Sequence, residues 1–128
     1  TSVWIEFFRG KQPWYDQVSE LLDQNEILAL SPIFGELLQG ARSNRERSII
    51  MDFWNNLPGT TETGMLVRAG IESSRQRWVD KGVGLIDGMI IIAARETGSF
   101  VWTLDKKLQL LLRKEERYLP PFPPATPF

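Results

Sequence analysis

A run of apolar residues from Met89 to Ala94 follows directly on Asp87 and Gly88. Thr97-Gly98-Ser99 then interrupts the pattern, and glycine after an apolar helical stretch is a common end of a helix because it adopts the left-handed conformation easily. The pattern predicts a buried helix with Asp87 as its first residue.

The segment Phe100–Leu104 is aromatic and β-branched without helical spacing, which predicts an interior strand. Asp105 follows it directly, at the carboxyl end of that strand. Ligands of open α/β sheets bind outside such ends, so Asp105 is a candidate site residue. Aspartate is also a favoured N-cap, and capping stays open as the alternative role for both Asp87 and Asp105.

The remaining pattern alternates between short apolar runs and amphipathic stretches. A second interior strand is predicted at Ile27–Leu30, after an apolar, aromatic start that ends at Gly10. Helices are predicted from about Pro13, from Ser31-Pro32 with Ser31 as the cap, over Arg42–Leu57, and over Thr61–Lys81 up to Gly82. Alternating strands and helices predict an α/β fold with a central parallel sheet flanked by helices.

Glu36 falls on the same helical stripe as Ile33 and Leu37, too far into the helix to be a cap. Burying a carboxylate beside apolar neighbours costs several kcal/mol unless a cation or hydrogen bonds offset it. A salt bridge to an arginine is one explanation, and a role in a site is the other. Glu36, Asp87 and Asp105 are therefore predicted near the carboxyl edge of the sheet.

The absence of histidine and cysteine from the 128 residues removes most classes of active site. It excludes Ser-His-Asp triads, thiol nucleophiles, disulfides and nearly all zinc or copper sites, and the lack of cysteine fits a reducing cytoplasm. Converging carboxylates repel one another unless a hard cation joins them, so Mg²⁺ or Mn²⁺ is the cofactor we expect. Acidic residues dominate up to Glu36 and basic residues beyond it, which permits a phosphate-rich partner.

Four blocks of the sequence together resemble those of the PIN-domain ribonucleases, in particular the VapC-type toxins of bacterial toxin-antitoxin pairs. The blocks are TSVWIEFFRG, SPIFGELLQG, GLIDGMIIIAARETG and VWTLDKKL. They are spread from Thr1 to about Leu112 in the expected order. The resemblance implies a PIN-like nuclease domain over residues 1–118, with a Pro-rich tail over 119–128.

The resemblance also implies an acidic quartet. Carried over by position, three of its members are Glu36, Asp87 and Asp105, with Thr103 beside the site and Thr1 or Ser2 in the first loop. The fourth is an Asp immediately before the TSVW-like block. The sequence begins one residue too late to show it, and we expect that an N-terminal piece is missing.

The function that follows from the resemblance is Mg²⁺- or Mn²⁺-dependent hydrolysis of RNA by a cytoplasmic toxin with a VapB-like antitoxin. Asp87 is the expected direct metal ligand, while Asp105 and Glu36 bind a second ion or orient the attacking water. A homodimer is expected, because the N-terminal aromatic residues exceed what a small domain readily buries. Two alternatives stay open: a catalytically degenerate PIN fold acting as an interaction module, and a receiver-like or phosphatase-like α/β domain. No run of residues approaches the length of a membrane span.

Overall fold

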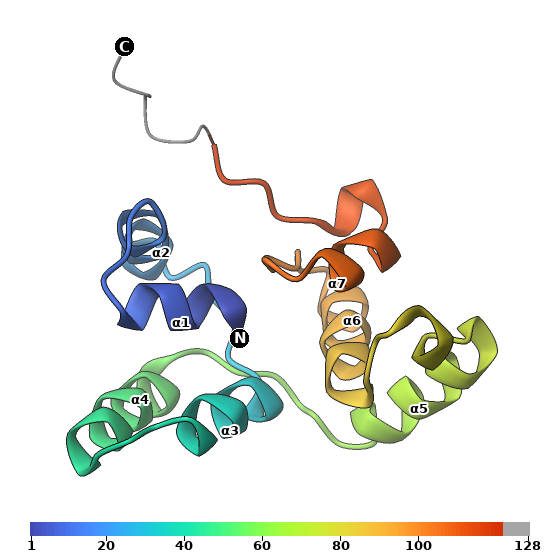
Figure 1. Cartoon of the computed structure of the whole chain (residues 1–128), viewed down its shortest axis with the longest axis horizontal. Coiled ribbons are helices and arrows are strands. Elements are labelled where there is room, and N and C mark those ends of the chain that lie inside the picture. The colour runs from blue at the N-terminus through green and yellow to red at the C-terminus, as the bar shows by residue number, and fades with distance from the viewer. Residues whose placement is uncertain (122–128) are drawn as a thin grey trace. The chain divides into compact units, whose positions relative to one another are not determined.

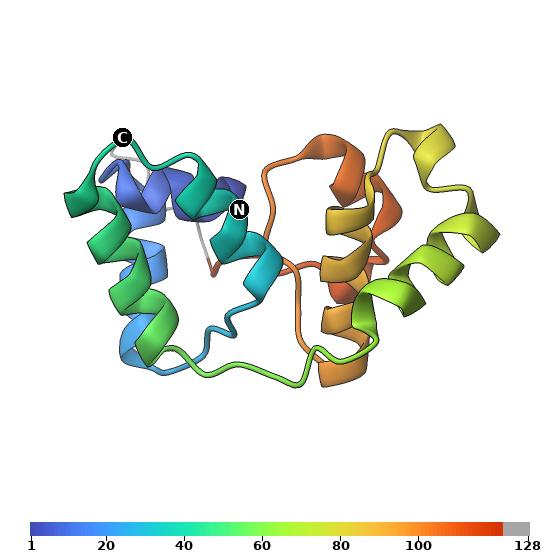
Figure 2. The same cartoon turned by 90° about the horizontal axis from the view of Figure 1, so that it is seen from below.

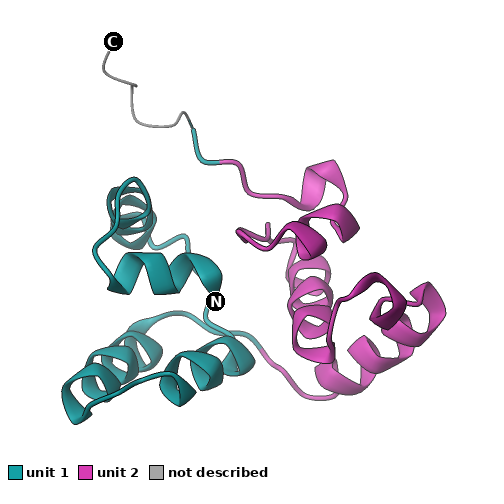
Figure 3. Ribbon diagram, viewed as in Figure 1, with its two compact units in different colours: residues 1–60, 120–128 teal, residues 61–119 magenta. Residues whose placement is uncertain are grey.

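The computed structural model describes residues 1–121, and there the chain is built from helices (Figure 1). It divides into two compact units, one made of Thr1–Thr60 with the chain from Pro120, the other of Thr61–Leu119 (Figure 3). Unit 1 holds α1 (Ser2–Phe8), α2 (Trp14–Asp23), α3 (Ser31–Gln39) and α4 (Asn44–Asn56). Unit 2 holds α5 (Met65–Gln76), the 3-10 helix η1 (Val79–Lys81), α6 (Leu85–Thr97), α7 (Lys106–Leu111) and the 3-10 helix η2 (Lys114–Glu116).

The core of unit 1 is a cluster of aromatic rings. Trp4 of α1 lies 5.5 Å from Phe34 of α3 and 5.7 Å from Phe53 of α4, ring centre to ring centre. Phe7 stacks on Tyr15 of α2 at 5.3 Å. The cluster therefore joins all four helices, because such ring pairs add favourable edge and stacking contacts to the burial of apolar area.

The core of unit 2 is α6, whose residues from Gly88 to Ala94 are all buried. Helix α5 lies beside it in both views (Figures 1 and 2). Gly88 is what lets the ring of Trp78 approach α6, since a Cβ at that position would lie 3.3 Å from the ring. The helix ends at Gly98 with φ +67°, so the predicted stop at Thr97-Gly98-Ser99 is confirmed.

The predicted PIN-like α/β fold with a central parallel sheet is wrong for residues 1–121, which contain no sheet. Ile27–Leu30 is not a strand, and a backbone hydrogen bond from Ala29 N–H to Pro58 O at 2.9 Å ties it to the segment after α4. Val101 forms an isolated parallel bridge with Arg117, while the rest of Phe100–Leu104 is irregular. Ala29, Leu30 and Val101 are buried in a fold of helices, whereas Leu28, Phe100 and Leu104 are exposed. Sequence alone does not distinguish such burial from a place in a sheet.

Three helix boundaries also differ from the prediction. The expected helix Thr61–Lys81 is divided, because Arg77 adopts the left-handed conformation at φ +57° and ends α5. Helix α6 begins at Leu85 with Gly84 as its N-cap, so Asp87 is the third residue of the helix and not the first. In α3, Ser31 is likewise the first helical residue, and Leu30 holds the cap position.

No helix within residues 1–121 combines the length and the apolar character that crossing a membrane requires. The Pro-rich tail predicted over 119–128 falls mostly outside the described residues, which end at Pro121.

Candidate functional site

Asp105 is the N-cap of α7. Its Oδ1 accepts hydrogen bonds from the backbone N–H of Lys107 at 2.8 Å and of Leu108 at 3.4 Å. Its own N–H donates to the hydroxyl of Thr103 at 3.1 Å, so Thr103 lies beside Asp105 as the sequence suggested. The capping interpretation of Asp105 is confirmed. Both hydrogen bonds are accepted by the same carboxylate oxygen, and Asp105 is exposed.

Asp87 stands in the first turn of α6 and is half-buried. At the third helical position its negative charge faces the positive end of the helix dipole, which stabilises an ionised carboxylate there. The next residue in the chain, Gly88, is buried against Trp78. The carboxylate is thus held on a rigid element.

A contact between Lys107 and Gly82 joins the two segments that hold these aspartates. A Cβ built on Gly82 would lie 3.0 Å from Cδ and 3.2 Å from Nζ of Lys107. Lys107 is the second residue of α7, and Gly82 precedes the N-cap of α6 by two residues. The contact therefore brings the first turn of α7 to the segment that leads into α6.

Glu36 belongs to unit 1, whereas Asp87 and Asp105 belong to unit 2, so neither unit by itself holds all three predicted site residues. Glu36 is exposed, and the apolar face of α3 is formed by Phe34 and Leu37 instead. The expectation that its carboxylate is buried is wrong. The hydroxyl of Thr1 donates to Oε1 of Glu36 at 2.7 Å, which links the first sequence block to the second.

The residue types fit a hard cation, since carboxylate and hydroxyl oxygens are the ligands that Mg²⁺ and Mn²⁺ prefer. Over residues 1–121, however, no three acidic side chains gather in a group that could hold a metal ion. Mg²⁺ is commonly held by one or two carboxylates together with substrate phosphates. The chemistry of the donors therefore fits a site of one or two carboxylates better than an all-protein cage.

Ion pairs engage much of the other charge in unit 2. Arg68 donates from Nε to Glu96 at 2.6 Å and from Nη2 at 2.8 Å, and these hydrogen bonds lower the pKa of Glu96. Arg95 donates to Glu116 at 2.7 Å and lowers the pKa of that carboxyl in the same way. None of these groups is a predicted site residue, so the shifted pKa values mark structural ion pairs.

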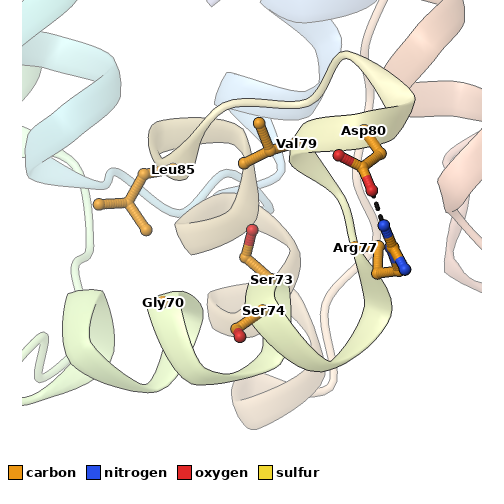
Figure 4. Close-up of a pocket in the computed structure, with 7 residues that line it drawn as sticks. All are labelled: Gly70, Ser73, Ser74, Arg77, Val79, Asp80 and Leu85. Atoms are coloured by element: carbon orange, nitrogen blue, oxygen red, sulfur yellow. Dashed lines mark hydrogen bonds and ion pairs between the residues drawn. The ribbon is translucent and has the colours of Figure 1, made fainter.

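A shallow groove in unit 2 was not foreseen from the sequence. It encloses about 490 Å³ between α5, η1 and the start of α6 (Figure 4). An ion pair between Arg77 and Asp80, 2.7 Å from Nε to Oδ2, borders it. Its lining residues are Gly70, Ser73, Ser74, Arg77, Val79, Asp80 and Leu85. The signal in the sequence was the small residues at helical spacing, Gly70, Ser73 and Ser74.

We compared the chain with models of protein families, with curated proteins and with solved structures. None of the three comparisons gives a match.

Proposed function

We propose that the chain is a Mg²⁺- or Mn²⁺-dependent endoribonuclease, the toxin of a toxin-antitoxin pair, that acts through Asp87 and Asp105. The observation that carries the proposal is the contact between Lys107 and Gly82, which brings the block that holds Asp105 to the segment directly before the block that holds Asp87. The hydrogen bond between Thr1 and Glu36 joins the other two blocks.

The proposed roles follow from the environments of the side chains. Asp87, half-buried on the rigid first turn of α6, serves as the direct ligand. Asp105 keeps Oδ1 on the backbone of α7, and its Oδ2 is the atom proposed to face the ion or to orient water. A bound Mg²⁺ or Mn²⁺ would lower the pKa of a water molecule and neutralise charge on the phosphate. Glu36 remains a predicted site residue, and its role is tested through its own variant.

The test is cleavage of total RNA by the full chain in Mn²⁺, with EDTA as the metal-free reaction. Asp87→Asn and Asp105→Asn should each reduce cleavage by orders of magnitude, because an amide gives up the charge that binds a hard ion. Asp105→Asn should still cap α7, since asparagine caps as well as aspartate. Asp80→Asn is the matched control, as it removes an exposed carboxylate from the same unit and should leave cleavage unchanged. Wild-type cleavage rates in both aspartate variants would overturn the proposal.

A second candidate is an interaction module without catalysis. The observation that favours it is that residues 1–121 bring no three acidic groups together. It predicts no metal-dependent cleavage by the wild-type chain, while binding of the antitoxin persists. Growth arrest on induced expression separates the two candidates, because Asp87→Asn should relieve arrest caused by RNA cleavage and should not relieve arrest caused by binding alone.

The partners proposed with the enzyme are the RNA substrate, a VapB-like antitoxin and a second copy of the chain. The aromatic residues that suggested a dimer are in part accounted for within unit 1, since Trp4 and Phe7 are each 8% exposed. Tyr15 remains 44% exposed. Sedimentation with and without antitoxin tests the dimer, and a monomer at high micromolar concentration in both cases would exclude it.

A further inference from the structure

Some basic residues of unit 2 are paired with carboxylates and others are not. Unit 2 carries ten basic and eight acidic residues. Three of its acids are paired with Arg68, Arg77 and Arg95. Over the described residues, no ion pair joins a carboxylate to the four exposed lysines of unit 2, which are Lys81, Lys106, Lys107 and Lys114. Within that part of the chain, Arg75 and Arg113 are likewise exposed without an ion pair, so the lysines carry part of the positive charge of unit 2 that is available to a ligand.

Two of these lysines belong to segments that meet. Lys81 is the last residue of η1, and its neighbour Gly82 lies against the side chain of Lys107 from α7. Gly82 adopts φ +80°, a conformation that suits glycine, and a side chain there would displace Lys107. The turn at Gly82 thus sets an ammonium group from α7 next to the end of η1.

The acids nearest in sequence do not neutralise this pair. Asp80 is hydrogen-bonded to Arg77 at 2.7 Å. Asp105 uses Oδ1 to cap α7, where it satisfies the backbone N–H groups of Lys107 and Leu108 and not the ammonium. Lys81 and Lys107 can therefore attract an anion from solution.

We propose that Lys81 and Lys107 form a binding surface for the phosphodiester backbone of single-stranded RNA. Both side chains are exposed, flexible point charges, which suits a chain of phosphates better than a single phosphate held by converging donors. Contacts of this kind position a nucleic acid without reading its sequence. The surface lies where the first turn of α7 meets the segment before α6, so it would direct the backbone to the end of unit 2 that carries Asp87 and Asp105.

The inference deepens the proposed function and rests on it for the choice of RNA as the anion. The experiment measures binding alone, so that its failure is separate from a failure of catalysis. A fluorescein-labelled single-stranded RNA of mixed sequence is titrated with the full chain in EDTA, and anisotropy is followed at several salt concentrations. The variants are Lys81→Gln, Lys107→Gln and the double variant.

The matched control is Lys114→Gln. Lys114 is an exposed lysine of the same unit, but it belongs to η2, which is tied by Glu116 to the last turn of α6. The expected result is weaker binding for each single variant and a smaller dependence on salt. The slope of log K against log salt should fall by about 0.7 for each lysine removed and by about 1.4 in the double variant. Lys114→Gln should leave the slope unchanged.

The inference is overturned if the double variant keeps the wild-type affinity and salt slope, or if Lys114→Gln lowers them equally. Tighter binding of double-stranded than of single-stranded RNA would also overturn it. Binding that depends on Lys81 and Lys107 without any cleavage in Mn²⁺ would support the surface and contradict the nuclease. Far-ultraviolet circular dichroism of each variant confirms that a loss of binding does not come from unfolding.

Discussion

Arg95, in the last turn of α6, donates a hydrogen bond from Nε to Oε2 of Glu116 at 2.7 Å and ties η2 to the buried helix. The pair is partly shielded from water, since the side chain of Glu116 is 12% exposed. The other oxygen of Glu116 accepts from the backbone N–H of Arg113 at 2.9 Å. The carboxylate thus organises the segment that forms the bridge to Val101, whose N–H donates to the carbonyl of Glu116 at 2.8 Å.

Replacing Arg95 by methionine should destabilise unit 2 by about 1–3 kcal/mol, because the shielded carboxylate of Glu116 loses its charged donor. Urea unfolding measures the change. Arg68→Met is the control, since its pair with Glu96 is more exposed and should contribute less to stability. Equal effects of the two substitutions would show that the burial of Glu116 does not strengthen the contribution of its ion pair to stability.

The same pair predicts how stability depends on pH. The hydrogen bond from Arg95 lowers the pKa of Glu116 below its ordinary value of 4.5. A carboxyl with a lowered pKa in the folded state contributes stability that is complete above the ordinary value and is lost as pH falls through the folded value. The difference in unfolding free energy between wild type and Arg95→Met should therefore be constant near neutral pH and shrink below about pH 4.5. A difference that stays constant down to pH 2 would contradict this.

Replacement of glycine by alanine should change the stability of unit 2 differently at Gly70 and at Gly88. Alanine is favoured over glycine inside a helix by about 0.5–1 kcal/mol. At Gly70 the new methyl group meets Leu85 at an ordinary 3.9 Å, so Gly70→Ala should stabilise unit 2 by about that amount. At Gly88 the new methyl group meets the buried ring of Trp78 at 3.3 Å, so Gly88→Ala should not gain the stability that alanine usually adds to a helix. Gly88→Val should destabilise unit 2 by about 1–3 kcal/mol. Thermal unfolding of the three variants checks the order.

The sequence predicts well those elements whose conformation is determined by residues close together in the chain. The buried helix before Gly98 and the cap at Asp105 follow from spacing and from the chemistry of single residues, and both are confirmed. The two predicted strands are wrong because a short apolar run does not by itself separate burial among helices, as at Leu30 and Val101, from pairing in a sheet.

In the candidate site, too, local contacts could be predicted from the sequence and contacts between separate elements could not. Thr103 beside Asp105 is a contact two residues apart, and its position was within reach of the sequence. The position of Glu36 was not, because the apolar face of α3 is set by Phe34 and Leu37 in a cluster of rings from four helices. The contact between Lys107 and Gly82 joins residues of separate elements and needs the three-dimensional structure to be seen.

Asp105 allows its structural and proposed catalytic roles to be separated, because asparagine and alanine substitutions act on them differently. Asp105→Ala removes both backbone hydrogen bonds of the cap and should destabilise α7 by about 1 kcal/mol. Hydrogen exchange should then accelerate at the amides of Lys107 and Leu108, while Asp105→Asn should leave their exchange close to that of wild type.

RNA cleavage completes the comparison. If Asp105 acts only as a cap, cleavage in the asparagine variant should match wild type while the alanine variant is impaired. If its charge serves the ion, both variants should lose cleavage to a similar extent, although only alanine loosens α7. Ser43→Ala, which removes the cap of α4 in the other unit, controls for a general effect of cap loss on activity. The proposed role of Asp105 predicts the second pattern, and the first would assign this residue to the fold alone.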